Sequence, residues 1–285
     1  MTVPVAELSE RVTSLWAKGA EADRAEGRNV FEALRGALSV GAVRAAEPDP
    51  ASPTGWRVNA WVKQGILFGF RFGVLSDMSA DHGRFSFFDK DTLPVRRFTP
   101  DCCVRIVPGG SSVRDGAFVA RGVVLMPPTF INIGAWIDER ALVDSNTLIG
   151  SCAQIGRRVH VSAGAQIGGV IEPVGAMPVI VEDDVLIGGN TGVYEGAVVK
   201  ERAVIGAGTI ITGSTPIYDL PNARVIKPEN GQPLVVPPCA VVVPGARAVT
   251  AEAGREWQLS LSTPVIVKYR DSRTDARTEL EQWIR

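Results

Sequence analysis

Two carboxylates in the middle of the chain stand where a general acid or base could act. Asp144 directly follows the aliphatic residue Val143, and Glu195 lies two residues after Val193, between a tyrosine and a glycine. A carboxylate held beside a reacting group can take a proton from an attacking nucleophile, particularly when partial burial raises its pKa. Exposed carboxylates are usually only solubilising. The spacing alone therefore leaves both interpretations open.

Histidines and cysteines restrict the chemistry further. The sequence has two histidines, His82 and His160, so a catalytic zinc site with three histidine ligands cannot be built, and we predict no metal centre. His160 could serve as a single catalytic base, although its place beside Val161 favours a structural role. No CxxC spacing occurs, and we interpret the four cysteines as reduced packing residues of a cytoplasmic protein: Cys102, Cys103, Cys152 and Cys239.

The candidate carboxylates lie in a segment with a six-residue period. An aliphatic residue recurs every six residues from Val113 to Ile167 and, after a break of fourteen residues, from Val181 to Ile217. A small or β-branched residue follows almost every one of them by four positions. This pattern predicts a solenoid of short flat strands, three to each eighteen-residue coil, with the aliphatic residue inward and the small residue near a corner. An ordinary antiparallel β protein would leave the period unexplained.

Stacking and loops of such a solenoid follow from the same pattern. Successive coils should lie about 4.8 Å apart, the usual spacing of strands. The many glycines of the segment suit corners that need unusual backbone angles. The break in the period, "IGGVIEPVGAMPV", contains Glu172, Pro173 and Pro178 and should be an excursion out of the coil. Excursions from solenoids commonly cover a binding groove.

The flanking segments predict helices before the solenoid and a mixed extension after it. Helices are expected at Val5–Lys18 and Asn29–Ser39, and a third in Trp56–Phe72, which begins as a strand; Glu47–Gly55 reads as a loop. In the last segment "TPVIVKYR" predicts a strand and "DSRTDARTELEQWIR" a helix. The chain is thus predicted to be mainly β, with an N-terminal helical domain at 1–100, a β-helix at 101–249 and a C-terminal extension at 250–285.

Composition argues against some classes of partner. The chain of 285 residues has a formal net charge of −1 and 21% charged residues, so neither nucleic acid nor membrane is an expected partner. No apolar run is long enough to cross a membrane, and the N-terminus lacks the apolar core of a signal peptide.

Basic residues and glycines near the solenoid are candidate binding groups. Arg105 could pair with a substrate carboxylate, because a guanidinium binds carboxylates through two parallel hydrogen bonds. Lys200 and Lys268 could form a basic rim for coenzyme phosphates. The backbone N–H groups of Gly188 and Gly189 could stabilise the oxyanion of an acyl-transfer intermediate. Each assignment competes with an ordinary solvated surface role.

Several longer strings resemble one enzyme family. The segment "VLMPPTFINIGAWIDERALVDSNTLIGSCAQIGRRVHVSAGAQIGGVIEP" resembles the signature region of the 2,3,4,5-tetrahydropyridine-2,6-dicarboxylate N-succinyltransferases, within the hexapeptide-repeat acyltransferases. The similarity continues in "ALSVGAVRAAE", "WVKQGILFGFRF", "VRDGAFVARG", "STPIYDL" and "TPVIVKYRD". It therefore covers most of the chain.

The resemblance implies a left-handed parallel β-helix that forms a homotrimer, with active sites between neighbouring subunits. Succinyl-CoA would lie along the groove of the solenoid and acylate tetrahydrodipicolinate, in diaminopimelate and lysine synthesis. The aspartate of the family's "VD" string falls on Asp144, where it is associated with substrate binding and catalysis. The arginine before "VVP" falls on Arg105, as a substrate contact.

One position departs from the family. Many members carry "ARSEVVEG", whose first glutamate is implicated in catalysis, whereas this chain has "GGNTGVYEG" and Gly192 at that place. The second glutamate is kept as Glu195. We expect Asp144 and Glu195 to carry the chemistry. Two alternatives remain: an acyltransferase with another donor or acceptor, such as acetyl-CoA, or a solenoid that only binds.

Overall fold

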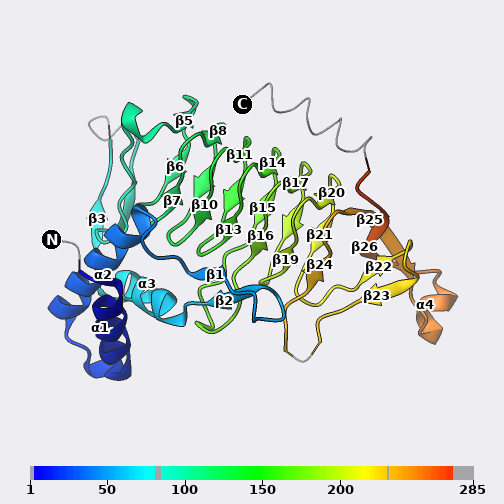
Figure 1. Cartoon of the computed structure of the whole chain (residues 1–285), viewed down its shortest axis with the longest axis horizontal. Helices are drawn as coiled ribbons and strands as arrows, with labels where there is room; N and C mark the ends of the chain where they lie inside the picture. Colours follow the sequence, from blue (N-terminus) through cyan, green and yellow to red (C-terminus); the bar gives the residue numbers. More distant parts are fainter. Residues whose placement is uncertain (1–2, 81–84, 230, 272–285) are drawn as a thin grey trace.

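The computed structural model describes residues 3–80, 85–229 and 231–271, which form a long prism of short strands with a helical unit at its N-terminal end (Figure 1). The chain passes through three hydrogen-bonded columns of strands in turn, once per coil. These columns are named the β5, β6 and β7 faces after their first strands. The fold is the left-handed parallel β-helix that the six-residue period and the family strings predict.

Each face is a column of two-residue strands. The β6 face contains β6 Ser112–Val113, β9 Phe130–Ile131, β12 Leu148–Ile149, β15 Gln166–Ile167, β18 Gly192–Val193 and β21 Ile210–Ile211. The β7 face contains β7 Phe118–Val119, β10 Trp136–Ile137, β13 Gln154–Ile155, β16 Ile180–Val181, β19 Val198–Val199 and β24 Val235–Val236. The β5 face contains β5 Arg105–Ile106, β8 Val124–Leu125, β11 Leu142–Val143, β14 His160–Val161, β17 Leu186–Ile187 and β20 Val204–Ile205.

The C-terminal end of the prism extends the β5 face with longer strands. They are β25 Ala240–Ala248, β26 Ser260–Tyr269, β22 Ile217–Asp219 and β23 Arg224–Ile226, with the short helix α4 Glu252–Glu256 between β25 and β26. The strand predicted from "TPVIVKYR" is thereby confirmed as part of β26. The helix predicted for the last fifteen residues lies outside the described residues, except for Asp271.

Register between coils confirms the length of the repeat. Phe118 pairs with Trp136 and Trp136 with Gln154, so a regular coil takes eighteen residues. The next pair in this column joins Gln154 to Ile180, so that coil is eight residues longer. The added length is taken up in the excursion at 168–178, where the sequence period breaks.

The aliphatic residues of the period fill the inside of the prism. Ile131, Ile149 and Ile167 stack in register on the β6 face, and each is 0% exposed. The small residues Ala135 and Ala153, at corners, are buried with them. Because coils stack about 4.8 Å apart, side chains repeat at the same short distance, and the corners are occupied by small or β-branched ones. Burial of this continuous aliphatic column stabilises the prism by about 0.8 kcal/mol per methylene.

Glycines occur at the corners for two different physical reasons. Gly134 has φ 76°, the left-handed conformation expected there. Gly150 and Gly188 do not adopt it. A Cβ on Gly150 would lie 2.2 Å from the backbone nitrogen of Gly169, and one on Gly188 would lie 2.5 Å from that of Ala207. The expectation of unusual backbone angles is wrong for Gly150 and Gly188. Glycine is needed at these two positions because another stretch of backbone passes close by.

Three helices form the N-terminal unit: α1 Val5–Ala17, α2 Arg24–Ser39 and α3 Ala60–Phe72. Their apolar sides share one buried core, as the predicted three- and four-residue spacing requires. Helix α2 begins earlier than the predicted start, because the side chain of Asp23 accepts a hydrogen bond from the backbone N–H of Glu26 at 2.8 Å and caps it. The domain limits at residues 100 and 249 remain a prediction.

The segment between α2 and α3 forms a strap across the prism. It is the hairpin of β1 Ala46–Pro48 and β2 Trp56–Val58, which Figure 1 shows beside β16 and β19. The loop predicted at Glu47–Gly55 is wrong at its start, which belongs to β1. The strap packs on Ile180 and Val198 on the outer side of the β7 face. This packing covers the apolar side chains there and fixes the helical unit to the prism.

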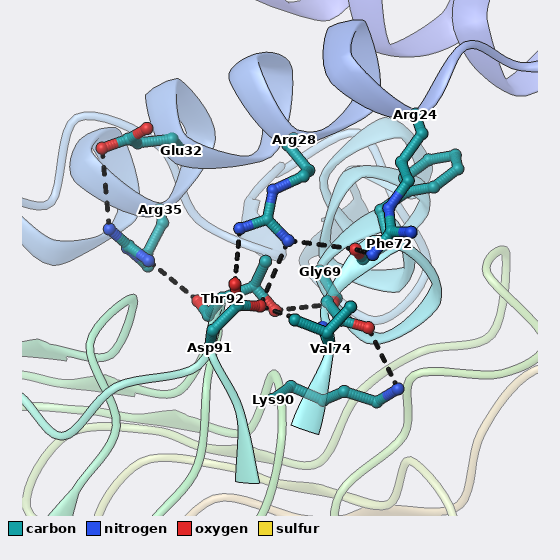
Figure 2. A network of polar contacts seen from close by, with 11 residues as sticks. Arg24, Arg28, Glu32, Arg35, Gly69, Phe72, Val74, Lys90, Asp91 and Thr92 are labelled. Atoms are coloured by element: carbon teal, nitrogen blue, oxygen red, sulfur yellow. Dashed lines mark hydrogen bonds and ion pairs between the residues drawn. The ribbon is translucent and has the colours of Figure 1, made fainter. Parts of the chain in front are cut away.

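A polar network joins α2 to the segment around the hairpin of β3 (Leu75–Asp77) and β4 (Phe88–Lys90). Figure 2 shows Arg28 facing Asp91, with hydrogen bonds of 3.1 and 2.7 Å to its two carboxylate oxygens. The same guanidinium donates to the carbonyl of Phe72 at 3.1 Å. The hydrogen bonds from Arg28 hold the pKa of Asp91 at about 2, below its usual value of 3.8.

No helix among the described residues is long and apolar enough to cross a membrane.

We expect the stability of the helical unit to fall in acid as Asp91 takes up a proton. Because its pKa is depressed to about 2 from 3.8, the stabilisation is complete above about pH 4 and is lost as the pH falls through about 2. Urea unfolding should show that Asp91→Asn flattens the pH dependence of the free energy of unfolding in this window. Asp101→Asn, which removes an exposed carboxylate elsewhere, should leave the slope unchanged. If the free energy of unfolding depends on pH equally in Asp91→Asn and in wild type, Asp91 is not the group that causes the loss of stability in acid.

Candidate active site

Asp144 lies at the edge where the chain passes from the β5 face to the β6 face, the β5–β6 edge. One of its carboxylate oxygens accepts a hydrogen bond from the backbone N–H of Ser145 at 2.7 Å. The other lies 3.9 Å from Nε2 of His160 on the next coil. The Asp144 side chain is 32% exposed and that of His160 13%. A carboxylate that a ligand can reach therefore stands beside a mostly covered imidazole, an arrangement able to accept a proton.

Arg105 shares the β5 face with this pair without touching it. In register, Arg105 pairs with Val124, Val124 with Leu142, and Leu142 with His160. Three coil spacings separate Arg105 from His160, which is about 14 Å along the face. The Arg105 side chain is exposed. It could therefore hold the far end of a ligand that reaches Asp144.

Gly188 and Gly189 lie on the same edge as Asp144, two coils further along. The backbone N–H of Gly188 donates to the carbonyl of Ile205 at 2.7 Å. The prediction that Gly188 could offer this N–H to an oxyanion is wrong, because the group continues the ladder between coils. A Cβ on Gly189 would meet only the carbonyl oxygen of Ala163, at 3.2 Å. The edge is therefore open beside Gly189.

A pocket of about 830 Å³ opens at the β6–β7 edge, where the excursion leaves the coil. Glu195 forms part of its wall, and the Oε2 atom of Glu195 accepts a hydrogen bond from the backbone N–H of Gly213 at 3.0 Å. The excursion contributes Glu172, Pro173 and Met177 to the lining. A loop predicted to cover a groove thus lines a pocket that also contains a predicted acid or base.

The two predicted catalytic carboxylates do not meet within one chain. Asp144 follows β11 at the β5–β6 edge, whereas Glu195 follows β18 at the β6–β7 edge, two coils further along. The width of the β6 face lies between them. A site containing both residues needs a second copy of the chain.

Both lysines predicted to bind coenzyme phosphates form ion pairs. Lys200 donates to Oε1 of Glu182 at 2.7 Å and to the carbonyl of Thr54 at 2.6 Å, which fastens the strap to the prism. Lys268 on β26 pairs with Asp271 at 2.9 Å, and both side chains are about half exposed, at 46% and 49%. Because an exposed pair contributes at most about 1 kcal/mol, Lys268 can change partners more easily than Lys200.

A buried lysine beneath the excursion was not predicted from the sequence. Lys63 on α3 is fully buried, and its Nζ donates to the carbonyl of Ala176 at 2.5 Å. Burial lowers the pKa of Lys63 and raises the pKa of the nearby Cys152 thiol to about 12, in keeping with the packing role predicted for that cysteine. A signal was present, since Lys63 is the single charged residue in the apolar run "WVKQGILFGF".

A second pocket, of about 550 Å³, lies beside the strap, and Arg44 forms part of its lining. The guanidinium of Arg44 lies 4.1 Å from the ring centroid of Trp136 and 5.2 Å from that of Trp56. Its Nε donates to Gln154 at 2.8 Å, and burial lowers the pKa of Arg44 to about 10. These contacts join the strap to the β7 face. Across the described part of the chain, no cluster of three or more histidine, cysteine, aspartate or glutamate side chains could hold a metal ion.

Comparison with known proteins assigns the family. Residues 7–72 match the model of the tetrahydrodipicolinate N-succinyltransferase N-terminal domain, and residues 178–213 match the hexapeptide repeat of succinyl-transferase. The 2,3,4,5-tetrahydropyridine-2,6-dicarboxylate N-succinyltransferase of Nitrobacter winogradskyi is 40% identical over 93% of this chain and 92% of its own length. That of Rhodopseudomonas palustris is 39% identical over the same shares. The chain belongs to the 2,3,4,5-tetrahydropyridine-2,6-dicarboxylate N-succinyltransferase family.

The family drawn from the quoted strings is thereby confirmed. A Campylobacter jejuni crystal structure described as a 2,3,4,5-tetrahydropyridine-2-carboxylate N-succinyltransferase is 16% identical, with a TM-score of 0.47 over 84% of this chain and 62% of that one. The excursion at 168–178 lies between the two segments that the family models cover, apart from residue 178, where the second segment begins.

Lys63→Met should loosen the excursion of this N-succinyltransferase family member without unfolding it. Methionine keeps an unbranched apolar stem in the helix core, but the carbonyl of Ala176 loses a charge-assisted hydrogen bond, usually about 1.5–3 kcal/mol. Amide hydrogen exchange across residues 174–178 should quicken by about tenfold or more, while the Tm changes by only a few degrees. Lys18→Met, at an exposed lysine on the helical unit, is the control. Unchanged amide exchange in Lys63→Met would show that Lys63 does not hold the excursion in place.

Proposed function

We propose that this protein transfers the succinyl group of succinyl-CoA to tetrahydrodipicolinate, giving N-succinyl-2-amino-6-oxopimelate in diaminopimelate and lysine synthesis. The observation that carries the proposal is the match to the Nitrobacter N-succinyltransferase over 93% of this chain and 92% of that protein. The long edges of the prism support it, because they offer room for an extended coenzyme. No acyl-enzyme is required, since an amine can attack the thioester directly.

The active site is completed by neighbouring copies in a homotrimer. The position of Asp144 and Glu195 on different edges supports this arrangement, because a neighbour that presents its β6–β7 edge brings its own Glu195 toward Asp144. Apolar residues on the outer side of the β6 face also favour burial against another copy. Ile210, for example, is 45% exposed there.

Asp144 is the general base of the reaction. It accepts the proton that the acceptor nitrogen loses while attacking the thioester carbonyl, and His160, 3.9 Å away, helps to hold that proton. Glu195 serves the proton transfers of ring hydration and opening. Arg105 pairs with a carboxylate of the acceptor, for which its exposed guanidinium is suited. No metal is needed in this scheme, because side chains supply every proton transfer.

The coenzyme follows the edge that carries Gly188 and Gly189, where missing side chains leave room for the pantetheine arm. Its phosphates lie near Lys268 on β26, at the C-terminal end of the prism, whereas Lys200 follows β19 at the edge between the β7 and β5 faces. Lys268 is the better candidate, since Lys200 would have to leave both Glu182 and the carbonyl of Thr54. The protein acts in the cytoplasm, which is supported by four cysteines that are free thiols.

A related transferase with a different acyl donor, such as acetyl-CoA, is the second candidate. It is favoured by Gly192, which stands where many family members carry a glutamate implicated in catalysis. A change at that position could alter the donor or the acceptor without changing the fold.

A thiol-release assay over a small donor and acceptor panel tests the function. We expect CoA release with succinyl-CoA and either tetrahydrodipicolinate or 2-aminopimelate, at rates well above those with acetyl-CoA. Faster release with acetyl-CoA would support the second candidate. No release with any pair would favour a solenoid that only binds.

Asp144→Asn should lower kcat by at least about a hundredfold, the low end of a general-base contribution, while the trimer persists in size-exclusion chromatography. Asp138→Asn is the matched control, because Asp138 occupies the equivalent position after β10 on another edge. It should keep kcat within about threefold of wild type. Near-normal turnover in Asp144→Asn would show that Asp144 is not the general base.

A further inference from the structure

The pocket at the β6–β7 edge has one aromatic side chain in its described lining, that of Tyr194. Much of the surrounding wall is glycine backbone, including Gly168 and Gly213. The charged groups of the lining are the carboxylates of Glu172 and Glu195. Tyr194 is therefore the group in this wall that combines a large surface with a hydroxyl.

The ring of Tyr194 rests on two residues that have no side chain. A Cβ built on Gly192 would lie 2.3 Å from Cε2 of the ring, and one on Gly168 would lie 2.9 Å from Cδ1. Real side chains cannot approach so closely. A side chain at position 192 and the Tyr194 ring in this place therefore exclude each other, and Gly192 is what allows the ring to lie over β18.

The hydroxyl of Tyr194 is placed for a ligand. It lies 2.9 Å from the position that a Cβ on Gly192 would take, so it occupies space that a side chain from that residue would enter. Tyr194 is half-buried, and within the described chain its hydroxyl has no hydrogen-bond partner. A phenol donates one hydrogen bond at neutral pH, whereas ionised carboxylates only accept. Gln232 is another side-chain donor in the lining, through its amide. Of the two, Tyr194 is the one that lies against Gly192, so it is the donor suited to a carbonyl oxygen at this position.

We propose that the Tyr194 hydroxyl donates a hydrogen bond to the carbonyl oxygen of the acyl group being transferred, supplying at this edge the polar contact that Gly192 lacks. The inference rests on the proposed succinyl transfer. As the nitrogen attacks, negative charge develops on that oxygen and the hydrogen bond strengthens. The contact should therefore act on kcat more than on KM.

Tyr194→Phe tests the hydroxyl alone, because it keeps the ring and its packing. With succinyl-CoA and tetrahydrodipicolinate we expect kcat to fall by about tenfold or more, with KM within about threefold and with Tm and oligomeric size unchanged. A smaller loss of kcat, or a loss confined to KM, overturns the inference.

Gly192→Ala tests the position of the ring. The added methyl must displace Tyr194, so kcat should fall as far as in Tyr194→Phe, and the double variant Gly192→Ala/Tyr194→Phe should lose little more than either single variant. Gly36→Ala, whose new methyl would meet nothing within 4 Å on α2, is the matched control. Full kcat in Gly192→Ala would overturn the inference.

The outcomes separate the two levels of the proposal. If the wild-type protein releases no CoA from succinyl-CoA with tetrahydrodipicolinate, the proposed function is wrong, and the inference about Tyr194 is wrong with it. An active wild type with an equally active Tyr194→Phe fails the inference alone, and the proposed function stands.

Discussion

Every feature of the prism depends on one constraint, the short and fixed distance between stacked coils. Backbone hydrogen bonds hold the coils about 4.8 Å apart, so each inward position is occupied by a vertical column of side chains. Ile131, Ile149 and Ile167 satisfy this because aliphatic side chains of one shape can stack without voids. Where two faces meet, the same spacing leaves room for small or β-branched residues such as Ala153 and Val159.

The constraint also explains why chemistry lies at the edges. Strand residues on the faces use both backbone groups in the ladder and point alternately inward and outward, which leaves little freedom for a site. At the edges the side chain that follows each strand is released from the core, as Asp144 and Glu195 are. Edges also tolerate glycine. On the adjoining strand β18, the missing side chain of Gly192 leaves a place that the ring of Tyr194 fills. Small changes at an edge can therefore alter chemistry while the prism is preserved.

The helical unit is attached to the prism through polar contacts as well as apolar ones. Lys200 fastens the strap through the carbonyl of Thr54 while it pairs with Glu182 of the prism, and Lys63 holds the excursion through the carbonyl of Ala176. Buried or half-buried charges tolerate little displacement, because an unpaired charge in such a place costs several kcal/mol. These contacts set where the excursion lies, and so they shape the pocket that contains Glu195.

The sequence by itself determined the prism, the excursion and the family, because the six-residue period is a local property repeated many times and the family strings are contiguous. It also indicated Asp144 and Glu195. Only the tertiary structure decided that these residues stand on different edges, that the Gly188 N–H is already bonded, and that Lys63 supports the excursion. Lys63 and Ala176 are 113 positions apart in the chain. Such a contact forms only when the helical unit packs against the prism. It therefore cannot be predicted from the sequence pattern of either unit alone.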